Sequence, residues 1–155
     1  VFVGANTDIE QKEKYDRVED AVCAVRSALE EGIVKGGGVA LMNCSSFLLK
    51  EFNNDESGEV FGDKHTALMI LTEACLEPVK QILKNAGREF EDIYPAYTLD
   101  DVSDYDVKNE CFGDMYDMGI IDPLKVTKNA FKNAVSVATT ILTTNAIITH
   151  ARVKQ

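Results

Sequence analysis

Residues 18–41, VEDAVCAVRSALEEGIVKGGGVAL, contain the pattern that decides the fold. The stretch begins inside a run whose apolar residues recur every three or four positions, as in an amphipathic helix, and the run stops at Gly32. After a short apolar bridge, Gly36, Gly37 and Gly38 open a second helix. Glycines let backbone N–H groups approach a ligand, and a helix N-terminus favours an anion or an oxygen-rich group. The pattern therefore predicts two consecutive helices joined by a candidate binding loop.

The segments on either side extend these two helices. Thr7 and Glu10 fit a capping box, so the first helix is expected to begin near Asp8. Residues 1–5 read as a short strand or the end of one. Beyond the glycines, the second helix is expected over residues 37–50.

The middle of the chain predicts a third helix and a small hairpin. Residues 63–87 have helical periodicity, and Pro78 is expected to break or kink this helix because proline lacks a backbone donor and clashes with the preceding turn. Residues 88–117 read as a short helix or turn followed by a hairpin around residues 105–115.

The C-terminal third predicts a long helix and a terminal strand. Asp122 and Pro123 are expected to start the helix, with Asp122 as the N-cap and Pro123 at the first helical position. The apolar pattern continues to about Thr144, and the β-branched residues of 146–149 favour a strand. The fold class is therefore mainly α, with a small hairpin and a terminal strand.

Composition excludes several functional classes. The 155 residues carry a formal net charge of −10, which disfavours binding to nucleic acids and to anionic membranes. No apolar run approaches the roughly 20 residues that span a bilayer. The four cysteines are widely spaced and have no histidine at ligand spacing, so no metal site is expected. Unpaired thiols suit a reducing compartment, such as the cytoplasm or an organelle matrix.

Four segments together resemble one family, the group I (GroEL-like) chaperonins. The most specific segment is DMGIIDP at residues 117–123, followed by KVT at residues 125–127. The others are RVEDA at residues 17–21, EEGIVKGGGVAL at residues 30–41, and the helix over residues 134–144. The segments occur in the order and at the distances of the family, and the resemblance covers nearly the whole chain.

This resemblance implies an ATP-driven machine that assists protein folding. The family builds heptameric rings, single or double, and works with a co-chaperonin and unfolded client proteins. Residues 1–31 resemble part of the intermediate domain, and residues 32–155 resemble the C-terminal half of the equatorial, ATP-binding domain. The apical domain, the phosphate-binding loop and the Mg²⁺ ligands are expected outside this chain.

Asp20 is the candidate catalytic residue. Its position on the polar face of a helix describes, by itself, a solvated acid. The resemblance implies instead that Asp20 activates the water that attacks the γ-phosphate of ATP, which requires a carboxylate within hydrogen-bond reach of that water.

The remaining candidates are implied to bind the nucleotide. Gly36 and Gly37 match the loop that packs its backbone against the sugar, although by itself the loop is only a turn before a helix. Lys35 departs from the small residue expected before these glycines, and adds a positive charge near the pocket mouth. Asp122 matches the acid that accepts hydrogen bonds from the ribose hydroxyls.

The base is implied to contact three residues in the last third of the chain. Asp106 and Val107 match the adenine-contacting pair, which is usually Asn-Ala, and Ile120 matches an apolar position beside the base. A carboxylate at position 106 accepts a hydrogen bond from the adenine amino group but cannot donate one. Two functions therefore remain open: an ATPase chaperonin subunit, favoured by Asp20, and a structural or oligomerisation module without turnover, slightly favoured by Asp106.

Overall fold

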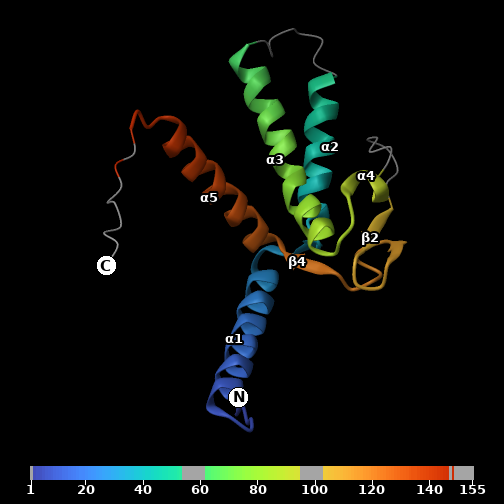
Figure 1. Ribbon diagram of the computed structural model, residues 1–155, viewed down its shortest axis with the longest axis vertical. Helices are drawn as coiled ribbons and strands as arrows, with labels where there is room; N and C mark the ends of the chain where they lie inside the picture. Colours follow the sequence, from blue (N-terminus) through green and yellow to red (C-terminus); the bar gives the residue numbers. More distant parts are fainter. Residues whose placement is uncertain (1, 54–61, 95–102, 147, 149–155) are drawn as a thin grey trace, which may run out of the picture. The chain divides into compact units, whose positions relative to one another are not determined.

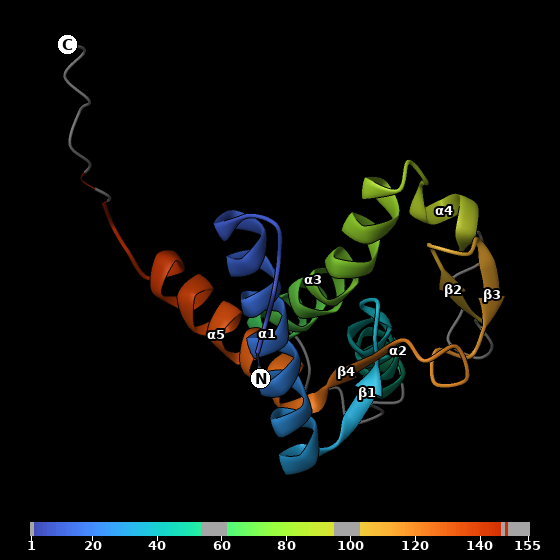
Figure 2. The ribbon, with the colours of Figure 1, turned by 90° about the horizontal axis from the view of Figure 1, so that it is seen from below.

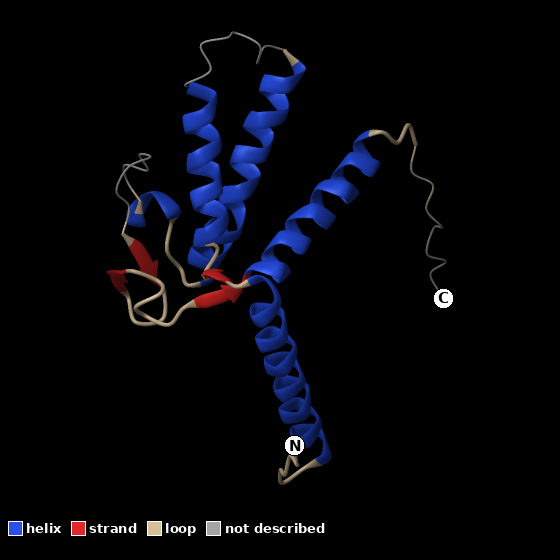
Figure 3. Cartoon of the chain, turned by 180° about the vertical axis from the view of Figure 1, so that it is seen from behind, coloured by secondary structure: helices blue, strands red, loops and turns tan. Residues whose placement is uncertain are grey.

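The computed structural model describes residues 2–53, 62–94, 103–146 and 148. These residues form five helices and four short strands (Figures 1 and 3). The helices are α1 (Asp8–Glu31), α2 (Val39–Asn53), α3 (Asp63–Asn85), α4 (Phe90–Ile93) and α5 (Leu124–Leu142), and the strands are β1 (Ile33–Lys35), β2 (Asp104–Asp106), β3 (Cys111–Gly113) and β4 (Ile121–Pro123). The predicted mainly helical fold class is confirmed.

Contacts within the chain divide it into two compact units. Unit 1 comprises residues 1–32 and 123–155, and unit 2 comprises residues 33–122. The domain boundary expected near residue 31 stays a prediction, because this division reflects only contacts made inside the chain. None of the described helices is both long and apolar enough to cross a bilayer.

Local signals set both ends of α1 in unit 1. The Thr7 hydroxyl accepts a hydrogen bond from the Glu10 backbone N–H at 3.2 Å, as a capping box requires. The Glu10 carboxylate accepts from the backbone N–H of Asn6, one residue earlier than the usual pattern. At the other end Gly32 has a φ of 89° and donates its N–H to the Ala28 carbonyl. The predicted bounds of this helix are confirmed.

The start of α5 differs from the prediction. Asp122 and Pro123 belong to β4, which pairs with β1, and Pro123 has an extended conformation with φ −66° and ψ 125°. No side-chain hydrogen bond caps the helix, while the backbone N–H of Leu124 donates to the Gly32 carbonyl at 3.1 Å. The prediction that Asp122 caps α5 and that Pro123 begins it is wrong. Strand pairing holds both residues extended, and the Gly32 carbonyl satisfies one N–H of the first turn.

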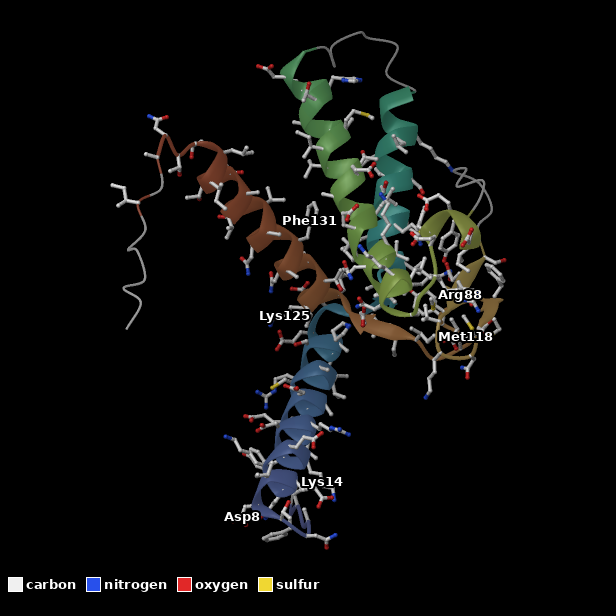
Figure 4. All side chains as sticks on the ribbon, viewed as in Figure 1. Asp8, Lys14, Arg88, Met118, Lys125 and Phe131 are labelled. Atoms are coloured by element: carbon white, nitrogen blue, oxygen red, sulfur yellow. The ribbon has the colours of Figure 1, made fainter. Side chains whose placement is uncertain are left out.

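Charged residues join α1 to α5 within unit 1. Lys125, labelled in Figure 4, forms an ion pair with Glu30, and Lys128 forms one with Glu31. The Lys125 ammonium lowers the pKa of the Glu30 carboxyl, and the carboxylate raises the pKa of Lys125. Neither helix contains a buried residue. Their exposed large apolar side chains include Tyr15, Val22, Val25 and Leu29 on α1, and Val126, Val135, Val137 and Ile141 on α5.

Unit 2 is built on α2 and α3, which lie side by side (Figure 1). The helices approach closely at Gly38, which has a φ of 82°, and a Cβ there would lie 2.9 Å from the Val79 backbone nitrogen. Pro78 does not break α3, which is a continuous helix, and the alternative that it kinks the helix stays a prediction. Buried residues on both sides of the proline, Cys75 before it and Leu83 after it, stabilise the helix through this position.

The core of unit 2 gathers residues from four elements and two loops. Its buried apolar members are Val39, Met42, Leu76, Val79, Leu83, Phe90, Tyr94, Tyr105 and Met115. The predicted hairpin is confirmed as β2 and β3, shown beside α4 in Figure 2. Tyr105 lies opposite Phe112 in the antiparallel register, with the ring centroids 4.9 Å apart.

Two expected strands are not confirmed. Residues 2–5 form no regular element, and residue 1 lies outside the described residues. Ala146 and Ile148 form no strand either, and the remaining positions of that expected strand, 147 and 149, are also outside the described residues. Both segments lack a partner strand in the described chain, and a strand without a partner leaves its backbone groups unpaired.

Candidate functional site

Unit 2 contains a cavity of about 420 Å³ lined by the glycine loop, α3 and the hairpin. This volume falls within the range of about 300–1,000 Å³ that is usual for small-molecule sites. Its apolar wall includes Val79, Ile82, Leu83, Tyr94, Met115 and Met118, the last of which is labelled in Figure 4. Four of the predicted nucleotide-binding residues also line the cavity: Gly37, Asp106, Val107 and Ile120. The structure therefore brings together residues that are far apart in the sequence.

The glycine loop supplies one wall without side chains. Gly37 has a φ of 65°, and a Cβ there would lie 3.3 Å from the Met115 Cε atom. Gly36 is buried behind the wall and donates its N–H to the Ile120 carbonyl at 2.9 Å. A Cβ on Gly36 would lie 3.1 Å from the Ile120 backbone carbon. Gly36 therefore holds Ile120 in place, while Gly37 faces the cavity.

The Asp106 carboxylate is already engaged in the hairpin turn. Asp106 is 5% exposed and accepts hydrogen bonds from the backbone N–H groups of Lys108 and Asn109 and from the Asn109 side-chain amide, at 2.8, 3.3 and 2.6 Å. The Asn109 amide, aided by the two backbone donors, lowers the pKa of Asp106. A carboxylate that accepts several such bonds fixes the turn. Its predicted contact with adenine stays a prediction.

A buried phenol completes the apolar wall. Tyr94 is 4% exposed, and burial raises its pKa to about 12. The side chain therefore remains neutral at physiological pH, so it adds no charge to the cavity. Tyr94 and Met115 were missed in the sequence because an apolar residue in an irregular segment does not reveal which cavity it lines.

Lys35 does not present a free charge at the pocket mouth. Its ammonium lies 2.8 Å from the Asp104 carboxylate and 2.6 Å from the Asp114 carboxylate. These two acids raise the pKa of Lys35, and Lys35 in turn lowers the pKa of Asp114. The sequence predicted a positive charge at this position but not its two carboxylate partners. No local signal indicated these partners, because they follow Lys35 at a great distance along the chain.

Two predicted site residues lie elsewhere. Asp122 is exposed on β4 and is not among the residues that line the cavity. Asp20 is exposed on α1, which belongs to unit 1. The roles of Asp122 at the ribose and of Asp20 in hydrolysis stay predictions.

The described residues offer no ready set of metal ligands. No three His, Cys, Asp or Glu side chains among them gather around one point. The acids near the cavity are committed to protein donors, Asp104 and Asp114 to Lys35 and Asp106 to its turn. That the Mg²⁺ ligands lie outside this chain stays a prediction.

Unit 2 is thus a helical unit with a largely apolar cavity beside a bare glycine loop. The chain belongs to the TCP-1/cpn60 chaperonin family, because a model of that family matches residues 1–152. The match includes parts of both units and supports a chaperonin-type role in protein folding.

Proposed function

We propose that the chain is the C-terminal part of a group I chaperonin subunit and contributes the sugar and base side of an ATP site. The observation that carries this proposal is the single cavity shared by Gly37, Asp106, Val107 and Ile120. The resemblance to the family implies that these four positions contact the nucleotide, and they lie between residues 37 and 120 of the sequence. An arbitrary set of residues spread over so much of the chain would rarely line one cavity.

The chemistry of the wall suits a nucleoside. Val107 and Ile120 offer apolar surface to the faces of a base, and the bare backbone at Gly37 allows a sugar to approach. Among the described lining residues Lys108 is the one basic side chain, and a triphosphate needs more partners than that to offset the cost of burying its charge. The phosphate and Mg²⁺ ligands would come from the N-terminal equatorial half, in keeping with residues 1–31 as intermediate domain and residues 32–155 as equatorial domain.

Calorimetric titration of the full-length subunit with ATP and Mg²⁺ tests the site. Gly37→Ala places a methyl group on the cavity wall and is expected to weaken ATP binding by about tenfold or more, the equivalent of about 1.4 kcal/mol. Gly87→Ala is the matched control, because Gly87 also has a positive φ, 73°, but a Cβ there meets nothing within 4 Å. Equal affinities in the two variants would show that the cavity is not the ATP site.

A structural or oligomerisation module without turnover is the second candidate. The observation that favours it is the Asp106 carboxylate, which its own hairpin turn already occupies. Steady-state ATP hydrolysis by the full-length protein separates the candidates. Saturable turnover supports the ATPase subunit, whereas assembly without turnover supports the module.

The proposed partners follow from the same assignment. The full-length subunit is expected to form heptameric rings, single or double, with a co-chaperonin and unfolded client proteins bound by its apical domain, in the cytoplasm or an organelle matrix. Light scattering on the full-length protein provides the test. A mass of seven or fourteen subunits supports the ring, and a monomeric mass at micromolar concentration contradicts it.

A further inference from the structure

One lysine connects three segments that surround the cavity. Lys35 ends β1, and its ammonium bridges Asp104, at the start of β2, and Asp114, just after β3. The Tyr116 ring centroid lies 5.9 Å from the same ammonium. The three members of this cluster, Lys35, Asp104 and Asp114, differ in burial, since their side chains are 24%, 4% and 41% exposed.

Asp104 makes the cluster more than a surface ion pair. A carboxylate that is almost fully buried needs a cation and hydrogen bonds to offset the loss of hydration. Asp104 receives the Lys35 ammonium at 2.8 Å and the Met115 backbone N–H at 3.1 Å on the same oxygen, Oδ2. The buried charge therefore holds β1 and the backbone at Met115 together.

Each member of the cluster is close in sequence to a wall of the cavity. Gly37 follows Lys35 by two residues, Asp106 follows Asp104 by two, and Met115 directly follows Asp114. All three of these neighbours line the cavity. One or two residues of backbone allow little independent movement. A shift of a cluster member would therefore also shift the neighbouring residue that lines the cavity.

We infer that Lys35 is a positioning residue that sets the spacing between the glycine loop and the hairpin around the cavity. The inference rests on the proposed ATP site. Lys35 itself lies outside the cavity lining, so it acts through Gly37, Asp106 and Met115 and not by touching the nucleotide. The family motif has a small residue at position 35, and in this chain a lysine that forms two ion pairs takes its place.

The test compares Lys35→Met with Lys80→Met in the full-length protein. Lys80 is a close match, because its side chain is 27% exposed, bridges Glu73 and Glu77, and lies 5.9 Å from the Phe90 ring centroid. Both of its carboxylate partners are on its own helix, however, so its ion pairs hold no two separate segments together. Lys35→Met is expected to weaken ATP binding by about tenfold. Lys80→Met is expected to bind as wild type, and Lys35→Arg to stay within about threefold of wild type because arginine keeps both ion pairs.

Amide hydrogen exchange supplies a readout that does not depend on ATP. The Gly36 N–H donates to Ile120 and the Met115 N–H donates to Asp104, so both report on the spacing of the walls. Both amides are expected to exchange at least about tenfold faster in Lys35→Met only. Asp114→Asn, which removes the more exposed partner, is a milder variant for use if Lys35→Met does not fold, and its expected loss of ATP affinity is about threefold.

The outcomes separate this inference from the proposed function. ATP affinity within twofold of wild type in Lys35→Met, or an equal loss in Lys80→Met, overturns the positioning role. Where Lys35→Met does not fold, wild-type affinity in Asp114→Asn overturns it. If the wild type itself does not bind ATP, the proposed function fails. Amide hydrogen exchange at Gly36 and Met115 is then the measurement that tests the positioning role of Lys35. Faster exchange in Lys35→Met, with wild-type exchange in Lys35→Arg and Lys80→Met, then supports it, and unchanged exchange in Lys35→Met overturns it.

Discussion

The two units use the same kind of helix with opposite results. The helices of unit 2 bury part of their apolar stripes, and Leu83 on α3 is 1% exposed, although Phe47 on α2 and Ile70 on α3 remain exposed. The helices of unit 1 have apolar residues at similar spacings, yet Leu29 on α1 is 84% exposed and neither α1 nor α5 has a buried residue. The difference shows that the spacing of apolar residues identifies the apolar face of a helix. That spacing does not indicate whether another part of the same chain covers the face.

The stabilising interactions of the units differ accordingly. Burial of a large apolar side chain contributes about 1.5–3 kcal/mol, and unit 2 has a cluster of such residues. In unit 1, the contacts between α1 and α5 include ion pairs that are partly exposed to solvent and contribute little in water. Unit 2 should therefore account for most of the stability of the isolated chain.

The largest expected effect is catalytic and concerns unit 1. In the full-length protein, Asp20→Ala is expected to lower ATP turnover by about a hundredfold or more, the usual scale for loss of a general base. ATP binding should be nearly unchanged, in contrast to Gly37→Ala in unit 2. Steady-state hydrolysis and calorimetry measure the two effects. Asp16→Ala, an exposed acid one turn earlier on α1, is the control, and an equal loss in both variants would remove the special role of Asp20.

The next effect tests the burial difference directly. Leu83→Ala is expected to destabilise the 155-residue chain by about 3 kcal/mol, because it removes buried apolar surface and enlarges the cavity that Leu83 already lines. Leu29→Ala removes the same atoms from an exposed position and should change the unfolding free energy by less than about 0.5 kcal/mol. Urea unfolding followed by circular dichroism measures both. Similar losses in the two variants would mean that α1 is covered in solution.

A glycine pair distinguishes close packing from backbone strain. Gly38 in unit 2 and Gly32 in unit 1 have φ values of 82° and 89°, but only at Gly38 would a Cβ meet backbone atoms, 2.9 Å from the Val79 nitrogen. Gly32→Ala should cost about 1 kcal/mol from strain alone, and Gly38→Ala about 2 kcal/mol or more because the helices must separate. Thermal unfolding of both variants checks this order, and equal shifts would argue against a close approach of α2 and α3.

The smallest effect is a pH dependence in unit 2. Burial raises the pKa of Tyr94 from 10.0 to about 12, so its contribution is complete below pH 10 and is lost as the pH rises through 12. Between pH 10 and 12 the loss amounts to about 2 kcal/mol, most of the roughly 2.7 kcal/mol that raising the pKa from 10.0 to about 12 is worth. Tyr94→Phe should flatten the decline in stability between pH 10 and 12. Tyr15→Phe, at a half-exposed position on α1, serves as the control and should follow the wild-type profile.

Local chemistry in the sequence was sufficient for much of the fold and for part of the site. Thr7, Glu10 and Gly32 predicted both ends of α1, since capping involves only residues within a few positions of each other. The hairpin was also predicted near its observed position, since its two strands are only a few residues apart in the sequence. The family motifs also selected Gly37, Asp106, Val107 and Ile120, and all four line one cavity.

Tertiary structure alone decided which long-range partners each residue found. Asp122 and Pro123 have strong local signals for a helix start, yet pairing of β4 with β1 holds them in a strand. The sequence around Lys35 does not indicate that Asp104 and Asp114 are its partners. An ion pair requires only that the two residues lie close in space, and it leaves no periodic pattern in the sequence. The sequence by itself determined the helices, their apolar faces and the family. Only the packed chain decided which faces are buried, as at Leu83, and which remain exposed, as at Leu29.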